Sequence, residues 1–145
     1  MTAEIDFRQL VEGAGDAIIV SDAAGVIVLW NAAATRIFGF TADEALGQTL
    51  DLITPERFRA RHWEGYRVTM ETGVTKYGTT LLRVPALHRD GRSLSIAFSV
   101  SLLCDAAGKV AQIVAMVRDE TERWQEERAL KTKLKALEAR EGAGS

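Results

Sequence analysis

The sequence predicts an α+β fold in which five antiparallel strands form one sheet and the helices pack on one of its faces. Three observations lead to this prediction. Runs rich in β-branched residues flank a central region with helical periodicity, turn signals at 89–91 and 105–108 separate the later runs, and one of these runs alternates strictly between large and small side chains. The predicted order is two strands, several helices, three strands and a final helix.

Composition places the chain among ordinary globular domains. It has 145 residues, of which 47% are hydrophobic and 26% charged, and its net charge is −2. Without a basic field, neither nucleic acid nor a membrane surface is an expected partner. No apolar run is long enough to span a membrane, so we expect a cytoplasmic protein. The single cysteine, Cys104, excludes an internal disulfide and is expected to be a small buried hydrophobe.

The N-terminal part predicts a short helix followed by a hairpin. Residues 4–13 place apolar side chains on one side and end at glycines, so we assign residues 1–14 to an amphipathic cap helix. Apolar runs at 17–20 and 26–30 surround an Asp/Gly loop, which is typical of a β-hairpin.

Two short helices are predicted next, because each has a recognisable start and end. Asn31 can cap a helix over 32–38, which ends at Gly39. Thr41 and Glu44 form a capping box for a second helix, which ends at Gly47.

The most informative segment is Thr54 to Gly73, which reads as one long helix. Thr54 suits the N-cap, Pro55 the first helical position and Gly73 the left-handed position after the end. At 100° per residue, one arc of this helix is mainly apolar and aromatic; it consists of Phe58, His62, Trp63, Tyr66, Thr69 and Met70. A titratable imidazole therefore lies on the face expected to point inward.

Three strands and a charged helix complete the predicted fold. The strand at 78–87 contains Pro85, which indicates an edge strand or a bulge. The strand at 93–102 alternates large apolar with small side chains, and 110–117 forms the fifth strand. We assign residues 15–118 to the domain core and 119–141 to a C-terminal helix. Leucines at 130, 134 and 137 follow coiled-coil spacing in that helix.

At this point the sequence resembles the PAS domains. The similarity lies in four segments: Leu29-Trp30-Asn31 with the following helix, Phe38 to Gly47, the Arg89-Asp90-Gly91 turn, and Arg118 to Arg123. The last segment resembles the motif that joins the final strand of these domains to a signalling helix. The resemblance implies a PAS fold with a sensory pocket between the sheet and the long helix. It also implies output through the terminal helices, usually in a dimer.

The long helix is similar to that of haem-binding PAS domains of the rhizobial oxygen-sensor kinase type. In those domains the proximal haem ligand is the histidine of a segment like Arg59-Ala60-Arg61-His62, and His62 is the matching residue. Where those domains have a tyrosine, this chain has Gly65, and Tyr66 follows one residue later. Where they have an arginine that contacts the bound ligand, this chain has Leu82, and Arg83 is the next residue. The resemblance thus implies haem b bound through His62.

Independent physical reasoning supports a histidine-bound haem in an apolar slot. The expected cofactor-contacting residues are the apolar arc of the long helix and the large face of the sheet: His62, Phe58, Tyr66, Met70, Leu82, Leu94, Ile96, Phe98 and Val100. His62 would be the iron ligand. The alternative is a haem-free dimerisation or adaptor domain whose pocket is empty or holds another small molecule.

Other activities have less support in the sequence. Covalent flavin chemistry would need a cysteine before the long helix, where the chain reads Leu50-Asp51-Leu52-Ile53. A noncovalent flavin would need polar groups on a pocket face that is mainly aliphatic. The chain shows no nucleophile and base with motif support, so we expect no enzymatic activity. A homodimer through the terminal helices is the expected assembly, and the sequence does not indicate the downstream signalling protein.

Overall fold

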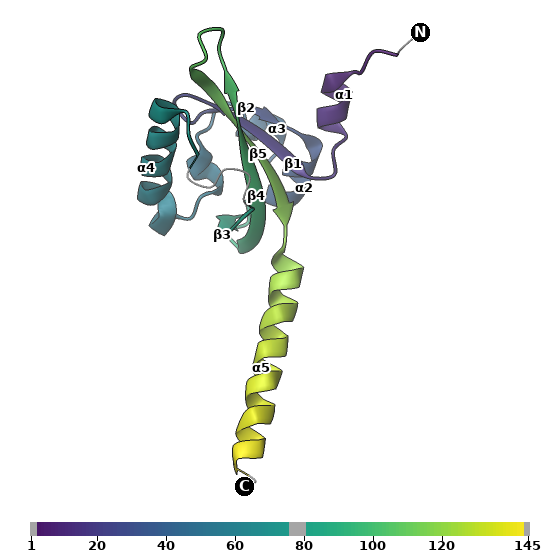
Figure 1. The fold of residues 1–145 in the computed structure, drawn as a ribbon. Coiled ribbons are helices and arrows are strands. Elements are labelled where there is room, and N and C mark those ends of the chain that lie inside the picture. The colour runs from purple at the N-terminus through teal and green to yellow at the C-terminus, as the bar shows by residue number, and fades with distance from the viewer. Residues whose placement is uncertain (1–2, 76–80, 144–145) are drawn as a thin grey trace.

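The sheet of the protein has five antiparallel strands in the order β2-β1-β5-β4-β3, which confirms the predicted α+β architecture (Figure 1). It is seen in a computed structural model that describes residues 3–75 and 81–143. The strands are β1 (Ala17–Asp22), β2 (Ile27–Trp30), β3 (Leu82–Leu87), β4 (Ser93–Cys104) and β5 (Val110–Asp119). The last strand therefore lies at the centre of the sheet, between the first strand and β4.

Helical segments connect the two edge strands and extend from both ends of the domain. They are α1 (Phe7–Glu12), α2 (Ala32–Phe38), α3 (Ala42–Ala45), the 3-10 turn η1 (Leu50–Ile53), α4 (Glu56–Thr72) and α5 (Thr121–Ala143). Figure 1 shows α4 beside the sheet, whereas α5 runs away from the domain as an isolated rod. The segments from α2 to α4 therefore form the helical layer.

Asn31 joins three parts of the N-terminal half through its amide group. Its Oδ1 accepts from the N–H groups of Ile18 (2.9 Å) and Ala34 (3.1 Å), and its Nδ2 donates to the carbonyls of Val11 (2.9 Å) and Asp16 (3.1 Å). The side chain is 1% exposed, so these bonds are shielded from water. The predicted N-cap is confirmed, and it also fixes β1 against α2.

The main core lies between the helices and the large face of β4. Leu94 and Ile96, which are 2% and 5% exposed, pack in one buried cluster with Ile19, Trp30 and Phe38. The small side chains between them point to the other face, as the alternation predicted. The predicted capping box of Thr41 and Glu44 is also present at the start of α3.

Pro85 lies in β3, an edge strand, and its register with β4 continues without a shift across the described residues. It stands opposite Ser95, whose N–H donates to Thr121 Oγ1 (3.0 Å) and whose carbonyl accepts from the Glu120 N–H (2.8 Å). Because Ser95 directs its backbone groups away from β3, the missing N–H of Pro85 removes no ladder bond. The edge position is thus the correct one of the two predicted explanations.

Several local predictions were wrong. Thr54 is not the N-cap of α4, because its hydroxyl donates to the Leu50 carbonyl (2.8 Å) across η1 and Pro55 precedes the helix instead. Cys104 is exposed, since it ends β4 beside a turn. His88, which precedes the Arg89-Asp90-Gly91 turn, is 15% exposed, and its ring lies against Gly39. The predicted left-handed end of α4 at Gly73 is confirmed, with φ of 71°.

The ends of the predicted elements differ modestly from those observed. Residues 78–80 of the predicted third strand lie outside the described residues. Strands β4 and β5 continue beyond their predicted ends because each is paired along its length. Among residues 3–75 and 81–143, no helix has both the length and the apolar character needed to cross a membrane.

Candidate functional site

The candidate site lies where α4 packs on the sheet at the hairpin end of β4 and β5. Tyr66, Val110 and Ile113 form a buried cluster there, 8%, 4% and 8% exposed. Partly buried apolar side chains surround it: Leu50, Trp63, Met70, Val100 and Leu102. This cluster, which we call the α4 cluster, is separate from the main core that contains Leu94 and Ile96.

Tyr66 fixes α4 to β1 through its hydroxyl group. The hydroxyl donates to the Asp22 carbonyl and lies 2.9 Å from Ser21 Oγ, within hydrogen-bond distance. Ser21 is only 2% exposed, and burial raises the pKa of Tyr66 above its ordinary value. The phenol is therefore a neutral, specific contact between the helix and the strand.

His62 lies one helical turn before Tyr66 and is half-buried. Its ring contacts Trp63 at 4.8 Å and Tyr66 at 5.9 Å between centroids. The Nδ1 atom is buried and has no hydrogen-bond partner among the described residues. Burial lowers the pKa of His62 below its ordinary value, and the Asp51 carboxylate opposes this only in part. The imidazole is therefore neutral at physiological pH, which is the form that binds metals.

Asp51 and its neighbours hold the segment before α4 against the site. The Asp51 carboxylate accepts from Trp63 Nε1 (2.8 Å) and lies 3.9 Å from Arg59 Nε. Arg59 also donates to the carbonyls of Thr54 (3.1 Å) and Asp51 (3.3 Å). The Trp63 ring covers Gly25, where a Cβ would meet a ring carbon at 2.2 Å.

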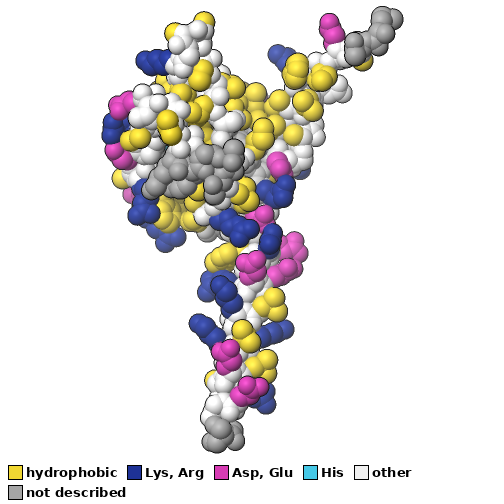
Figure 2. Space-filling model, viewed as in Figure 1, with side chains coloured by type: hydrophobic (Ala, Val, Ile, Leu, Met, Phe, Trp, Pro, Cys, Tyr) yellow, Lys and Arg dark blue, Asp and Glu magenta, His cyan; other side chains and the backbone are white. Residues whose placement is uncertain are grey.

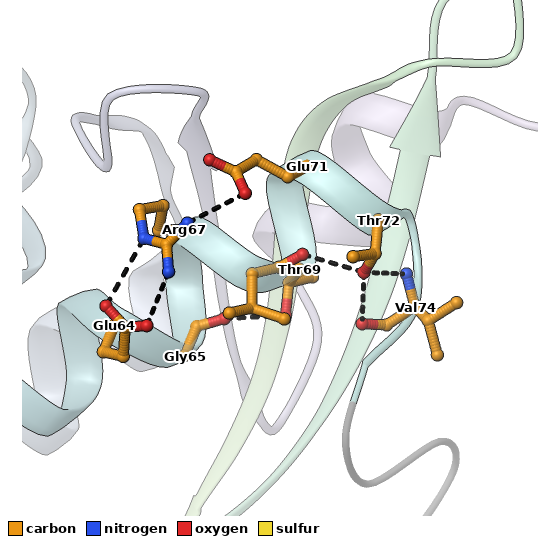
Figure 3. Close-up of polar contacts among 8 residues, drawn as sticks. Glu64, Gly65, Arg67, Thr69, Glu71, Thr72 and Val74 are labelled. Atoms are coloured by element: carbon orange, nitrogen blue, oxygen red, sulfur yellow. Dashed lines mark hydrogen bonds and ion pairs between the residues drawn. The ribbon is translucent and has the colours of Figure 1, made fainter.

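The outward side of α4 carries solvent-exposed polar contacts. Arg67 lies between Glu64 and Glu71 (Figure 3), and its guanidinium nitrogens are 2.6 and 2.8 Å from their carboxylate oxygens. Figure 3 also shows the Thr69 and Thr72 hydroxyls bonded to backbone carbonyls near the end of the helix. These exposed contacts support the helix only weakly. The outward face of α4 is therefore polar and exposed, whereas the face with Tyr66 packs on the sheet.

A hollow of about 300 Å³ lies beside the α4 cluster and opens to solvent. It is bounded by α4 and the turn between β1 and β2, and its lining residues are Ala23, Ala24, Trp63, Tyr66, Arg67, Met70 and Glu71. This volume is at the lower end of the range for small-molecule sites. The hollow lies outside the contact between Tyr66 and the sheet.

The structure divides the predicted site residues between two clusters. Tyr66, Met70 and Val100 meet in the α4 cluster, whereas Leu94, Ile96 and Phe98 belong to the main core. Leu82 is half-buried and stands opposite Phe98 on the same face of the sheet. Phe58 is half-buried beneath the Arg57 guanidinium, 4.8 Å from its ring centre.

Arg83 lies on the other face of the sheet. It stands opposite Ala97, and the uninterrupted register places it one residue out of phase with Leu82. There it borders a small hollow with Ser95 and Trp124. A contact between Arg83 and a ligand in the α4 cluster is therefore excluded in this arrangement.

Sequence reasoning missed Val110, Ile113 and Ser21 as parts of this site. Ile113 could have been considered, because it lies in the predicted strand at 110–117; the structure pairs it with Leu102, which places both on the inner face. Ser21 could not, since its contact with Tyr66 joins residues 45 positions apart. Only the tertiary fold brings these two groups together.

The residues present fit the chemistry that haem iron needs from a protein ligand. His62 offers a neutral imidazole next to aromatic and aliphatic side chains, and its buried Nδ1 lacks a partner within the described part of the chain. The space between Tyr66 and β5 is filled by side chains. A macrocycle between α4 and the sheet would therefore require α4 to move outward.

Comparisons with known proteins agree with this architecture. The sequence matches the family profile described as PAS fold over residues 5–119. It is 32% identical over 127 residues to Sensor protein FixL of Bradyrhizobium diazoefficiens, covering 86% of this chain and 24% of that protein. It is 28% identical over 93 residues to Oxygen sensor protein DosP of Escherichia coli, covering 64% of this chain and 11% of that protein. The chain thus spans a quarter or less of these relatives.

Solved structures show the same fold at lower sequence identity. The PAS domain of a protein from Colwellia psychrerythraea superposes with a TM-score of 0.70 at 20% identity, covering 80% of this chain and 95% of that one. The PAS domain of BvgS from Bordetella pertussis gives a TM-score of 0.63 at 22% identity, covering 90% and 95%. Together with the match over residues 5–119, these findings show that the chain belongs to the PAS family.

Proposed function

We propose that this PAS domain is a haem-binding sensor of a diatomic gas or of redox state, in which His62 would hold the iron. The observation that carries the proposal is the state of His62, a neutral and half-buried imidazole whose Nδ1 has no partner among the described residues. A buried polar atom without a partner is unfavourable, and such atoms in native proteins often have a functional reason.

The similarity to two sensor proteins supports the same function. One of them is named an oxygen sensor, and the sequence relationship to Sensor protein FixL covers most of this chain, including α4. Because fold alone does not define function, the argument depends on the histidine and its surroundings rather than on the PAS architecture.

The residues of the α4 cluster would form the binding site. His62 would hold the iron, and Trp63, Tyr66, Met70 and Val100 would supply the apolar surface that keeps water out. When bound, haem supplies an iron centre that binds a gas or exchanges an electron. The contact of Tyr66 with Ser21 and Asp22 must open for α4 to move, so these hydrogen bonds would oppose haem binding.

A change at α4 would reach the C-terminal helix through the sheet. Val110 and Ile113 contact Tyr66 and belong to β5, which ends at Asp119 directly before α5. For sensing, the two positions of α4 must differ in affinity for the bound group. The terminal helix would then transmit the difference to a second subunit or to a downstream protein.

A haem-free adaptor domain is the second candidate. The observation that favours it is the closed packing of Tyr66 on Val110 and Ile113, which already buries the inward face of α4. In such a protein the open hollow of about 300 Å³ could hold a smaller ligand, or none. The two candidates differ in whether haem binds and whether His62 is needed.

An absorption spectrum separates the candidates. The protein is purified from cells supplied with a haem precursor, next to His62→Ala and the matched control His88→Ala. We expect a Soret band in the parent and in His88→Ala that is lost or shifted in His62→Ala, with circular dichroism confirming that all three are folded. The absence of a band in the parent, even after hemin is added to the purified protein, would favour the adaptor. A band that His62→Ala leaves unchanged would assign the iron to another ligand.

A further inference from the structure

We propose that the open hollow beside α4 binds a small quaternary ammonium compound, whose methylated cation rests against Trp63 and Tyr66 and is attracted by carboxylates at the rim. This inference does not depend on haem binding. The hollow measures about 300 Å³, which is enough for a trimethylammonium group, and it lies between α4 and the turn that joins β1 to β2. Because it is already open to solvent, a ligand can enter it with α4 in the observed position.

Two aromatic rings form a corner of the hollow. The Trp63 and Tyr66 rings both line it, and they are inclined at 68° with their centroids 5.5 Å apart. An aromatic ring attracts a cation through its quadrupole, and two rings at a steep angle can contact one methylated cation on two sides. Ala23, Ala24 and Met70 supply further apolar lining. The corner therefore suits a cation that is bulky and weakly hydrated.

The hydrogen-bond donors of both rings are already in use. Trp63 Nε1 donates to the Asp51 carboxylate (2.8 Å), and the Tyr66 hydroxyl donates to the Asp22 carbonyl. Neither ring therefore offers a donor to an anionic or strongly polar ligand. Donation to an oxygen also makes each ring richer in electrons, which strengthens its attraction for a cation. A quaternary ammonium fits this lining because it carries no N–H group that would need an acceptor.

The rim of the hollow is negative on balance. Arg67 and Glu71 line it, and the Arg67 guanidinium is paired with the carboxylates of both Glu71 and Glu64. These three side chains carry a net charge of −1, so a cation is attracted, whereas an anion would have to displace a carboxylate from Arg67.

The surroundings of the hollow favour a free small molecule over a lipid headgroup. Figure 2 shows acidic and basic side chains together over the outer side of α4, and the side chains of Glu64, Arg67 and Glu71 are all more than half exposed. A charged, hydrated rim gives no apolar surface that could enter a bilayer. The ligand that fits is therefore a dissolved compound with a trimethylammonium group.

Isothermal titration calorimetry with choline tests the proposal. The chain is purified without a haem precursor, and choline chloride replaces sodium chloride so that the ionic strength stays constant. We expect a dissociation constant on the order of a millimolar, because the ligand has few atoms. The uncharged carbon analogue, with a tert-butyl group in place of trimethylammonium, should bind at least about tenfold more weakly, since it keeps the shape but loses the attraction to the rings and carboxylates.

Substitutions locate the bound cation. Trp63→Leu should weaken choline binding about tenfold because it removes an aromatic face, and Glu71→Gln should weaken it about threefold because it removes a carboxylate of the rim. Glu56→Gln is the matched control, since it makes the same charge change at an exposed position in the first turn of α4 and should leave the constant within about twofold. The exposed Glu71 variant decides the matter if Trp63→Leu does not fold.

Several results would overturn the proposal. They are the absence of choline binding at roughly 50 mM, equal binding of the carbon analogue, and equal effects of Glu71→Gln and Glu56→Gln. Sedimentation with phosphatidylcholine vesicles separates the two sources of the cation. The chain should stay in solution, and co-sedimentation would contradict the assignment to a free small molecule. Because no haem is present in the titration, its result is independent of haem binding.

Discussion

Removing the Tyr66 hydroxyl tests whether it fastens α4 to the sheet. Tyr66→Phe keeps the ring in the α4 cluster but removes the bonds to the Asp22 carbonyl and to Ser21 Oγ. The Asp22 carbonyl keeps its bond from the Gly25 N–H (3.0 Å), whereas the Ser21 hydroxyl, 2% exposed, has lost a buried partner. One hydrogen bond and one poorly satisfied hydroxyl together correspond to a loss of about 1.5 kcal/mol in the free energy of unfolding.

The assay is urea unfolding together with thermal unfolding of the apo protein. For a chain of 145 residues the unfolding entropy is roughly 0.3 kcal/mol/K, so a loss of about 1.5 kcal/mol lowers the melting temperature by about 5 °C. A double-mutant cycle with Ser21→Ala isolates the contact, and we expect a coupling energy of about 1 kcal/mol. A loss below about 0.3 kcal/mol in Tyr66→Phe would refute the idea that this hydroxyl holds the helix, and additive effects of the two substitutions would refute a contribution from its contact with Ser21.

Other substitutions test other parts of the structure. Asn31→Ala should lower the free energy of unfolding by about 3 kcal/mol in urea titrations, because it leaves buried backbone groups without partners, and Asn31→Asp should lose less because the bonds accepted by Oδ1 remain. Gly25→Ala combines a φ of 79° with a Cβ placed 2.2 Å from the Trp63 ring and should cost about 2 kcal/mol or more, whereas Gly15→Ala, with no atom within 4 Å of its Cβ, should change stability by less than about 0.5 kcal/mol. Burial lowers the pKa of His62 in the folded protein below its ordinary value of 6.5, so the unfolded chain binds a proton more readily. The free energy of unfolding should therefore fall as the pH drops through 6.5, and His62→Gln should remove that part of its pH dependence.

The sequence was sufficient to predict the order of the elements because their signals are local. The cap at Asn31, the capping box at Thr41 and the alternation of 93–102 each depend on residues a few positions apart, and the structure contains all three. Thr54 shows the limit of such signals. It has the right residue type for an N-cap, but η1 forms directly before it and its hydroxyl bonds to Leu50 instead.

The candidate site was less predictable, because its composition depends on which part of the sheet α4 covers. Helical periodicity correctly placed Tyr66 and Met70 on the inward face. Strand alternation placed Leu94, Ile96 and Val100 on one face of β4, and this is also correct. Alternation gives no position along the strand, however. It could not show that α4 packs only near the end with Val100, whereas Leu94 and Ile96 belong to the main core with Phe38 of α2 and Leu50 and Leu52 of η1.

The junction with α5 determines what a movement of α4 could do to the C-terminal helix. Strand β5 is paired on both sides, with β1 and β4, so it resists bending along most of its length. Beyond Asp119 the chain is held by the backbone of Ser95. The Ser95 carbonyl accepts from the Glu120 N–H, and the Ser95 N–H donates to the Thr121 hydroxyl. Ser95 lies between Leu94 and Ile96, whose side chains are in the main core. The direction of α5 is therefore set by β4 and the main core, and a signal from α4 must shift β4 against β5 to change it.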